Sequence, residues 1–408
     1  MSTVRYWLWL STRGSSPERY AARILAHFGT PEGAYHADQG AYDQMEGLPG
    51  KAKKALLDKS LAGVDKILED CQRLGIRILT IQDAAYPERL RQIQEPPCVL
   101  YVKGQLPALD DEAAVAIVGA RKASPYGIMA ARKLGLDLAR QGALVVSGSA
   151  RGIDSAALEG ALKGGGRVVS VLGNGIDVIY PAGNQALYED VAAQGALISE
   201  YPPGTEPRGS HFPLRNRILA GLSLGVVVVE GTETSGSLIT ARWALEENRD
   251  VFAVPGNLDA PLSKGPNGLI RKNEAKLILD AWDILEEYEF LYPAKLHPKG
   301  ELSQQAQEAR LRQPQEPPKP AAEPEPEREE EKPKLIVDLR KDPEVFTDDE
   351  AALIRALQGE GNLTADDLVE LTGIPARRVM SALTMLQVRQ LVTQGPGKRF
   401  STPVLLNQ

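Results

Sequence analysis

Glycines and cations gather in short loops between residues 119 and 173, and these are the residues of this chain whose types could do chemistry. Glycine lets backbone N–H groups approach an anion closely, and a helix that follows adds partial positive charge at its first turn. The candidate anion contacts in these loops are Gly119, Arg121, Lys122, Ser147, Gly148, Ala150, Arg151, Gly152 and Gly173. The pattern predicts phosphate binding.

A second cluster lies in the segment RGSHFPLRNR, residues 208–217, where cations surround an aromatic ring. Proteins that bind single-stranded nucleic acid use this mixture, because arginine contacts phosphates while an aromatic face accepts any base. The candidates here are Arg208, His211, Phe212, Arg215 and Arg217. Taken singly, Phe212 could be a core residue and the last two arginines could be structural ion pairs with Glu200 or Glu230. Together with the glycine loops, they favour binding of an extended polyanion.

These loops contain no recognisable catalytic set. None matches the dinucleotide pattern GxGxxG, the Walker pattern GxxxxGK[ST] or the nucleophile turn GxSxG. There is also no His, Cys and carboxylate cluster of the kind that binds a metal. We expect Asp154, Asp177 and Glu230 to cap helices or to pair with the arginines. The sequence therefore predicts a binding protein that is not an enzyme and that needs no metal or cofactor.

Regularly alternating elements position these loops. Short apolar runs predict strands at Ala113–Gly119, Ala143–Gly148, Arg167–Gly173, Ala196–Glu200, Gly225–Gly231 and Asp250–Gly256. Helices fit between them, for example at Pro125–Gln141, Asp154–Lys163 and Ser237–Asn248. This alternation is typical of an α/β fold with a doubly wound parallel sheet, here a Rossmann-like core over residues 113–289 within a domain spanning 63–290. Loops that follow parallel strands share one edge of the sheet, which is where such folds bind ligands.

Smaller regions flank this domain. Residues 1–62 are expected to be helical, with a helix start at Ser16-Pro17-Glu18 and a turn at Gly47-Leu48-Pro49-Gly50 like that of a helix-hairpin-helix (or SAM-like) domain. That turn could present N–H groups to a phosphate, or the region could be a small bundle that only packs. Residues 291–345 are rich in Pro and Glu and predict a disordered linker.

Residues 346–408 predict a winged helix. Three helices are expected at Asp348–Gln358, Ala365–Leu371 and Pro375–Gln387, followed by a hairpin with its tip at Gly395-Pro396-Gly397. Residues 376–400 hold five basic residues and no acid, whereas acids dominate the first part of this domain. Contact with duplex DNA and docking of a protein are equally compatible with this pattern.

Bulk composition agrees with a multidomain protein. A chain of 408 residues predicts two to four domains. Its net charge of −7 is uneven, because Gln313–Pro333 alone contributes −4, so basic sites remain compatible with an acidic whole. Two cysteines, Cys71 and Cys98, exclude a disulfide framework. With no signal-like or membrane-spanning run, we expect a cytoplasmic protein without membrane contact.

The chain resembles the DprA/Smf family, the DNA-processing proteins of bacterial transformation. The resemblance is carried by IVGARKASPYG (117–127), VSGSARGIDSAALEGAL (146–162), VLGNGIDVIYPAGN (171–184), ISEYPPGTEP (198–207), FPLRNRILAGLS (212–223), SGSLITA (235–241) and AVPGN (253–257). It implies a homodimeric protein that binds and protects single-stranded DNA and helps to load the RecA recombinase. Carried over by motif, it places Gly119, Arg121 and the loop after residue 146 on phosphates, and Phe212 and Arg215 in the pocket.

A second class of function is an enzyme similar to the lonely-guy phosphoribohydrolases, which have a related sheet. Those enzymes carry a PGGxGTxxE loop that supplies a carboxylate. The nearest segment of this chain, residues 230–237, lacks the pattern. Release of a base from a nucleoside monophosphate would revive this alternative.

Overall fold

The computed structural model describes residues 3–13, 18–298, 335–338, 346–360, 363–389, 391–395, 399–402 and 404–407. They belong to two compact units, Met1–Pro314 and Gln315–Gln408, which are described separately below. None of the described helices is long and apolar enough to cross a membrane.

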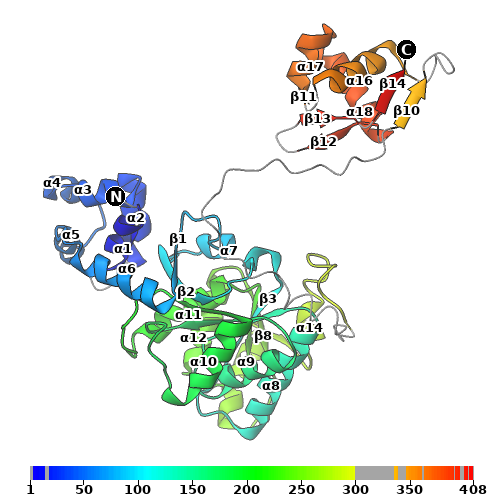
Figure 1. The fold of residues 1–408 in the computed structure, drawn as a ribbon. Helices are drawn as coiled ribbons and strands as arrows, with labels where there is room; N and C mark the ends of the chain where they lie inside the picture. The colour runs from blue at the N-terminus through cyan, green and yellow to red at the C-terminus, as the bar shows by residue number, and fades with distance from the viewer. Residues whose placement is uncertain are drawn as a thin grey trace. The chain divides into compact units, whose positions relative to one another are not determined.

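A nine-stranded sheet forms the centre of the first unit (Figure 1). Its strands are β1 (Arg77–Thr80), β2 (Val99–Gly104), β3 (Ala114–Val118), β4 (Leu144–Ser147), β5 (Val168–Leu172), β6 (Gly195–Ser199), β7 (Gly225–Val228), β8 (Asp250–Ala253) and β9 (Lys276–Leu277). Their order is β1-β2-β6-β5-β4-β3-β7-β8-β9. Neighbours from β6 to β9 pair in parallel, whereas β2 is antiparallel to both β6 and β1. The predicted doubly wound α/β sheet is confirmed.

Both faces of the sheet are covered by helices, which explains why the strand sequences are apolar throughout. In β3, Val115 and Ile117 join one core cluster, while Ala114, Ala116 and Val118 join the other. Helices α8 (Pro125–Arg140), α9 (Ile153–Lys163) and α10 (Gln185–Gln194) contribute to the first cluster. Helices α11 (His211–Gly221), α12 (Gly236–Glu246) and α13 (Lys264–Arg271) contribute to the second.

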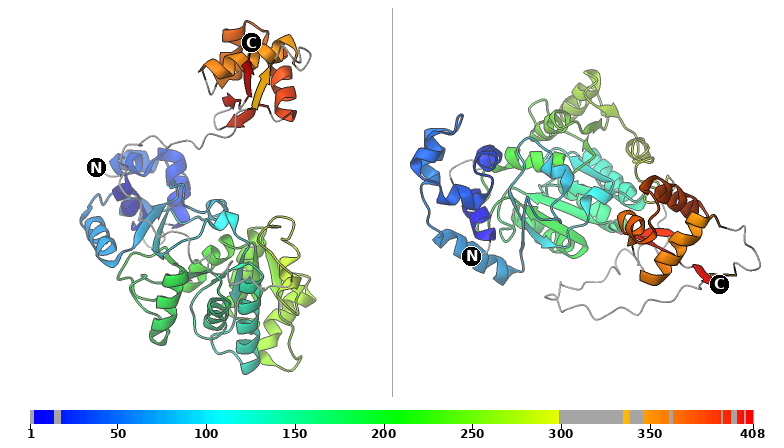
Figure 2. Two further views of the ribbon diagram at one scale, coloured as in Figure 1. Left: turned by 45° about the vertical axis from the view of Figure 1, so that its right-hand side comes forward. Right: turned by 90° about the horizontal axis from the view of Figure 1, so that it is seen from above.

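The helical N-terminal region lies beside β1 and β2 (Figures 1 and 2). It comprises α1 (Val4–Ser11), α2 (Glu18–Phe28), α3 (Pro31–His36), α4 (Gln39–Asp43), α5 (Gly50–Leu56) and α6 (Ala62–Leu74). The predicted turn joins α4 to α5, and Gly47 there has φ +71, a conformation that glycine adopts at little cost. Ser16 and Pro17 lie outside the described residues. Trp7 and Trp9 share a core cluster with Val99 and Tyr101, so the core continues across the expected boundary at residue 62.

Residues 291–298 pack on the first unit, although we expected the linker to begin at 291. Leu296 is buried, Lys295 Nζ lies 3.1 Å from a Glu112 carboxylate oxygen, and the His297 N–H donates to Gln141 O at 3.1 Å. Residues 299–334 and 339–345 of the expected linker lie outside the described residues.

The second unit contains the expected winged-helix elements: α16 (Asp348–Glu360), α17 (Ala365–Thr372), α18 (Ala376–Val388), β11 (Leu363–Thr364), β12 (Thr393–Gly395) and β13 (Arg399–Ser401). Thr364 and Asp367 form a capping box that starts α17. One element differs from expectation. Residues Leu335–Asp338, which we assigned to the linker, form β10 and pair in parallel with β14 (Val404–Asn407).

Candidate nucleic-acid interface

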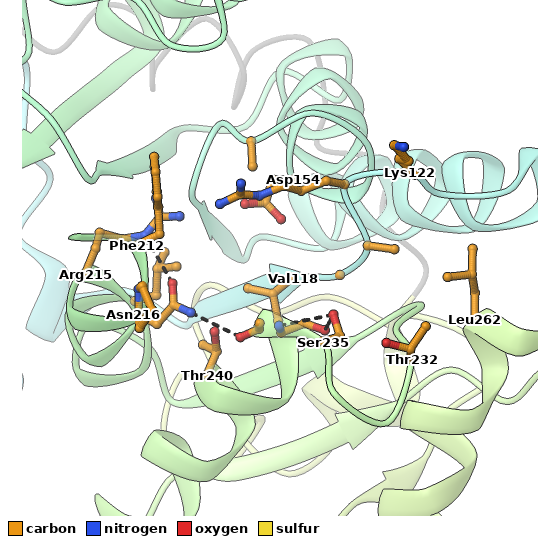
Figure 3. A pocket seen from close by; sticks show the side chains of 18 of the residues that line it. Val118, Lys122, Asp154, Phe212, Arg215, Asn216, Thr232, Ser235, Thr240 and Leu262 are labelled. Atoms are coloured by element: carbon orange, nitrogen blue, oxygen red, sulfur yellow. Dashed lines mark hydrogen bonds between the residues drawn. The ribbon is translucent and has the colours of Figure 1, made fainter. Parts of the chain in front are cut away.

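A pocket of about 380 Å³ lies at the carboxyl edge of the sheet, where the strand order reverses between β3 and β7 (Figure 3). Such switch points open a crevice, because the connections from the two central strands lead away in opposite directions. The pocket is lined by the loops after β3, β4 and β7 and by the start of α11. Of the predicted site residues, the structure brings together Gly119, Arg121, Lys122, Ala150, Phe212 and Arg215 in its wall.

The loop after β3 supplies the exposed cations of the pocket. Arg121 and Lys122 are exposed, and neither makes an ion pair with another described residue. The Arg121 guanidinium carbon lies 4.8 Å from the centre of the Phe212 ring, a cation–π distance. The loop ends where Ser124 Oγ accepts a hydrogen bond from Gly127 N at 3.1 Å and caps α8. The loop therefore presents two long basic side chains, Arg121 and Lys122, to solvent, and its end is fixed by the helix cap.

The loop after β4 is held mainly by internal contacts. Ser147 is fully buried and its hydroxyl donates to Ile117 O at 2.6 Å, so it joins β4 to β3 instead of facing the pocket. Gly152 has φ +84, and a Cβ there would lie 2.3 Å from Ala120 O, so only glycine lets the two loops meet. Arg151 is exposed but lies outside the pocket lining.

Two predicted phosphate-contacting glycines have a packing role. A Cβ on Gly148 would lie 2.4 Å from Arg215 Nη1, and one on Gly173 would lie 2.9 Å from the Phe212 ring. Neither glycine lines the pocket. Both make room for side chains of α11 that do line it. Their contact with phosphates stays a prediction from the sequence.

Arg215 is part of the pocket wall although its side chain is almost wholly buried. It is 4% exposed, and its guanidinium donates to Gly148 O at 2.9 Å, to Val171 O, and to Asn216 Oδ1 at 3.2 Å. Burial lowers its pKa from the ordinary arginine value, and nearby Asp154 opposes that effect. A positive charge is thereby fixed beneath the Phe212 ring, 6.0 Å from its centre.

Arg217, a predicted nucleic-acid contact, does not line the pocket. Its side chain is fully buried. Its two terminal nitrogens donate to the Glu200 carboxylate at 3.0 and 2.5 Å, and Nε donates to Glu95 O at 2.8 Å. The structural ion pair with Glu200, which we had kept open, is the arrangement found.

His211 and Arg208 also lie outside the pocket lining. The His211 ring stacks on Tyr201 with centroids 4.2 Å apart, and its Nδ1 lies 3.0 Å from Gly173 O. Burial lowers the pKa of His211 from 6.5. Arg208 is exposed and forms no ion pair with another described residue, so it adds positive charge beside the pocket entrance.

The three carboxylates near the loops separate into two roles. Glu230 accepts hydrogen bonds from Ser124 N at 2.9 Å and Ser124 Oγ at 2.5 Å, and Asp177 accepts one from Gly204 N at 2.8 Å. Both hold loops through these bonds, whereas we expected them to cap helices or to pair with the arginines. Asp154 lies in the pocket wall, where burial raises its pKa to about 6 in spite of Arg215 and Arg121 nearby.

Sequence reasoning missed the far wall of the pocket, which is built by Asn216, Thr232, Ser235, Ser237, Thr240 and Leu262. The Ser-Gly-Ser segment was visible as a loop after a strand. Asn216 and Thr240, however, lie inside helices, and nothing in their sequence spacing shows that both face the same cavity.

Comparison with known proteins identifies the family. Residues 77–289 match the model described as DNA recombination-mediator protein A, and residues 315–398 match the DprA winged helix domain. Protein Smf of Synechocystis sp. is 34% identical over 409 residues, which cover 98% of each chain. DNA processing protein DprA of Bacillus subtilis is 42% identical over 240 residues, 59% of this chain and 80% of that protein. The X-ray structure of DNA processing protein A from Streptococcus pneumoniae has a TM-score of 0.61 and 34% identity, covering 70% of this chain and 98% of that one. This chain therefore belongs to the DprA/Smf family of DNA recombination-mediator proteins.

Proposed function

We propose that the pocket between β3 and β7 binds single-stranded DNA and that this binding serves a recombination mediator. The observation that carries the proposal is the pairing of exposed Arg121 with the Phe212 ring at the switch point of the sheet. A single strand offers phosphates for the cations and unstacked bases for the ring, at about 1–3 kcal/mol per stacked base. The loop residues Lys122, Arg151 and Arg208 add positive charge along the same edge.

Binding of a labelled oligothymidylate tests this proposal. Arg121→Ala should weaken binding by about tenfold or more and change the unfolding midpoint little, because the side chain is exposed, makes no ion pair with another described residue and contacts only the face of the Phe212 ring. Arg140→Ala is the matched control, since Arg140 is an exposed arginine at the last turn of α8, at the opposite edge of the sheet. Equal affinities for the wild type and Arg121→Ala would refute the assignment.

The salt dependence of binding adds a second readout. For single strands the logarithm of the binding constant falls with the logarithm of salt concentration by about 0.7 per phosphate contacted. Arg121→Ala should therefore make this slope shallower by about 0.7, the amount expected for the loss of one phosphate contact, whereas Arg140→Ala should leave the slope unchanged. An unchanged slope in Arg121→Ala would mean that this guanidinium does not contact the backbone.

Loading of RecA, homodimer formation and a cytoplasmic location are part of the same proposal, and the family's description as a recombination mediator supports the first. Loading predicts that the protein accelerates RecA assembly on a strand already covered by a single-stranded-DNA-binding protein. Arg121→Ala should lose that acceleration. Light scattering of the purified chain tests the homodimer.

For the winged helix, the structure supplies an argument against strong duplex binding. Arg378 Nε and Nη2 both donate to Asp349 at 2.8 Å, and Arg389 pairs with Glu350 at 3.5 Å. These pairs reduce the positive field around α18, which leaves protein docking as the better supported role. A chain ending at residue 314 should then bind oligonucleotides as the full chain does. Loss of all DNA binding on that truncation would transfer the interface to the winged helix.

The pocket gives little support to the lonely-guy-like alternative. Its chemistry needs a carboxylate from the loop after β7 in the site, whereas neither Glu230 nor Glu233 lines the pocket, and the Glu230 carboxylate accepts two hydrogen bonds from Ser124. Incubation with nucleoside monophosphates should release no base.

A further inference from the structure

The half of the pocket next to α12 has a different chemistry from the half next to α8 and α9. Lys122 and Asp154 lie on one side, whereas Asn216, Ser235 and Thr240 lie on the other (Figure 3). Arg121, which precedes Lys122 in the same loop, also lines the pocket. The side chains of the second half are uncharged, although the Arg215 guanidinium adjoins them and donates to Asn216 Oδ1 at 3.2 Å. Val118, Leu219 and Leu262 add apolar surface to the pocket lining. Apolar walls with a few neutral hydrogen-bonding groups are typical of a site for a flat organic ring, not for a phosphate.

Thr240 carries an unsatisfied hydroxyl in this half. The residue is 1% exposed, and its Oγ1 is buried without a hydrogen-bond partner within the part of the chain that the structure describes. A threonine inside a helix usually bonds to the carbonyl four residues earlier. That carbonyl, Gly236 O, accepts a hydrogen bond from Asn216 Nδ2 at 3.2 Å instead. A buried hydroxyl without a partner costs free energy, which a ligand atom would recover.

The first turn of α12 is poorly suited to an anion, although a helix terminus usually favours one. The Ser237 N–H donates to Ser235 Oγ at 3.4 Å, and the Leu238 N–H donates to Ser235 O at 3.1 Å. Two of the N–H groups that could cradle a phosphate at this turn are thus already bound within the loop. Side chains therefore supply much of what this half of the pocket offers to a ligand.

We infer that this neutral half, defined by Asn216 and Thr240, binds the hydrogen-bonding edge of one nucleobase of the strand. The inference rests on the proposed single-stranded DNA function and assigns residues to it. Thr240 offers a hydroxyl that both donates and accepts, and Asn216 keeps one amide hydrogen and one oxygen lone pair after its bonds to Gly236 and Arg215. The phosphate on the same nucleotide then lies toward Arg121 and Lys122.

Removal of the hydroxyl tests the inference with two probes of equal length, an oligothymidylate and a strand of abasic residues. Thr240→Val keeps the shape of the side chain, and it should preserve or raise the unfolding midpoint because an unsatisfied buried group is lost. It should weaken oligothymidylate binding by about threefold to tenfold and leave binding of the abasic strand unchanged. Thr240→Ser keeps the hydroxyl and should bind both probes as the wild type does.

Three outcomes would overturn the inference: an equal loss for both probes, no loss for either, or wild-type protein that binds both probes with the same affinity. Each of these leaves the proposed function intact. Wild-type protein that binds neither probe would instead refute the proposed function. If Thr240→Val did not fold, Thr240→Ala would answer the same question with the same two probes.

Discussion

The loop after β3 and helix α11 look alike in sequence, since both combine arginines with small or aromatic residues, yet the fold uses them in opposite ways. Arg121 in the loop is exposed, has no ion-pair partner among the described residues and lies over an aromatic ring. Arg217 in the helix is fully buried and bound to Glu200. A charged residue type therefore shows where a polyanion could bind only after its burial and its internal partners are known.

The largest expected effect is on stability, at the buried member of this comparison. Arg217→Ala should cost about 3–5 kcal/mol of unfolding free energy, because Glu200 is left in a mostly buried site without its partner. Chemical denaturation measures this cost. The double variant Arg217→Met with Glu200→Gln removes both charges and should recover much of it. A loss under about 1 kcal/mol would show that the pair is not structural.

Arg215→Ala should combine both kinds of effect, because this arginine is buried and also lines the pocket. Its loss leaves Gly148 O and Val171 O without their donor, which should cost about 2–3 kcal/mol, and it also removes charge beneath Phe212. Denaturation and oligonucleotide binding are measured on the same samples. Weaker oligonucleotide binding with unchanged stability would show that Arg215, like Arg121, contributes to binding and not to the fold.

Gly173→Ala tests whether the position of the ring matters. The added Cβ would lie 2.9 Å from the Phe212 ring and should displace it, costing about 1–3 kcal/mol and weakening oligonucleotide binding. Gly209→Ala is the matched control, because Gly209 lines the same pocket and a Cβ there meets nothing within 4 Å. Similar losses in the two variants would show that the pocket tolerates no added carbon, whatever its direction.

The smallest expected effect is a pH dependence of stability and of oligonucleotide affinity that arises from Asp154. Burial raises its pKa from 3.8 to about 6, so the folded state binds this proton more readily than the unfolded state does. Its contribution to stability is therefore most favourable at low pH and is lost as pH rises through about 4 to 6. Below about pH 6 the neutral carboxyl no longer opposes a polyanion, so oligonucleotide affinity should rise there.

Asp154→Asn separates this effect from that of His211, whose pKa burial holds below 6.5. At neutral pH, the variant should bind the oligonucleotide as tightly as the wild type does under mildly acidic conditions. Any pH dependence of binding that remains in the variant is then assigned to His211. A pH profile identical to that of the wild type would exclude Asp154 as its source.

Much of the fold was predictable because its signals are local. Valine-rich runs such as β5 and β7 are covered on both faces, and a glycine follows within three residues of each, at 173 and 231. Both the strands and the edge that carries the loops could therefore be predicted from the sequence. The capping pair Thr364 and Asp367 was likewise visible as residues three apart. The strand β10 could not be predicted, because its partner β14 lies some seventy residues away in the sequence.

The site was only partly predictable, since its contacts join separate loops. Arg215 and Arg217 are two residues apart on one helix, and their sequence neighbourhood does not show that one contacts the pocket and the other Glu200. The roles of Gly148 and Gly173 depend on side chains from α11 that pass close to them. A glycine that makes room for a neighbour and a glycine that contacts a ligand look the same in a sequence.

The contact between Gly148 and Arg215 also constrains how this protein can diverge among descendants. Any residue larger than glycine at 148 would place its first carbon 2.4 Å from Nη1 of Arg215. A larger residue at 148 would therefore push this guanidinium away from its hydrogen bonds to Gly148 O and Val171 O, unless position 215 were shortened as well. The two positions are expected to change together in evolution, although 67 residues separate them in the sequence.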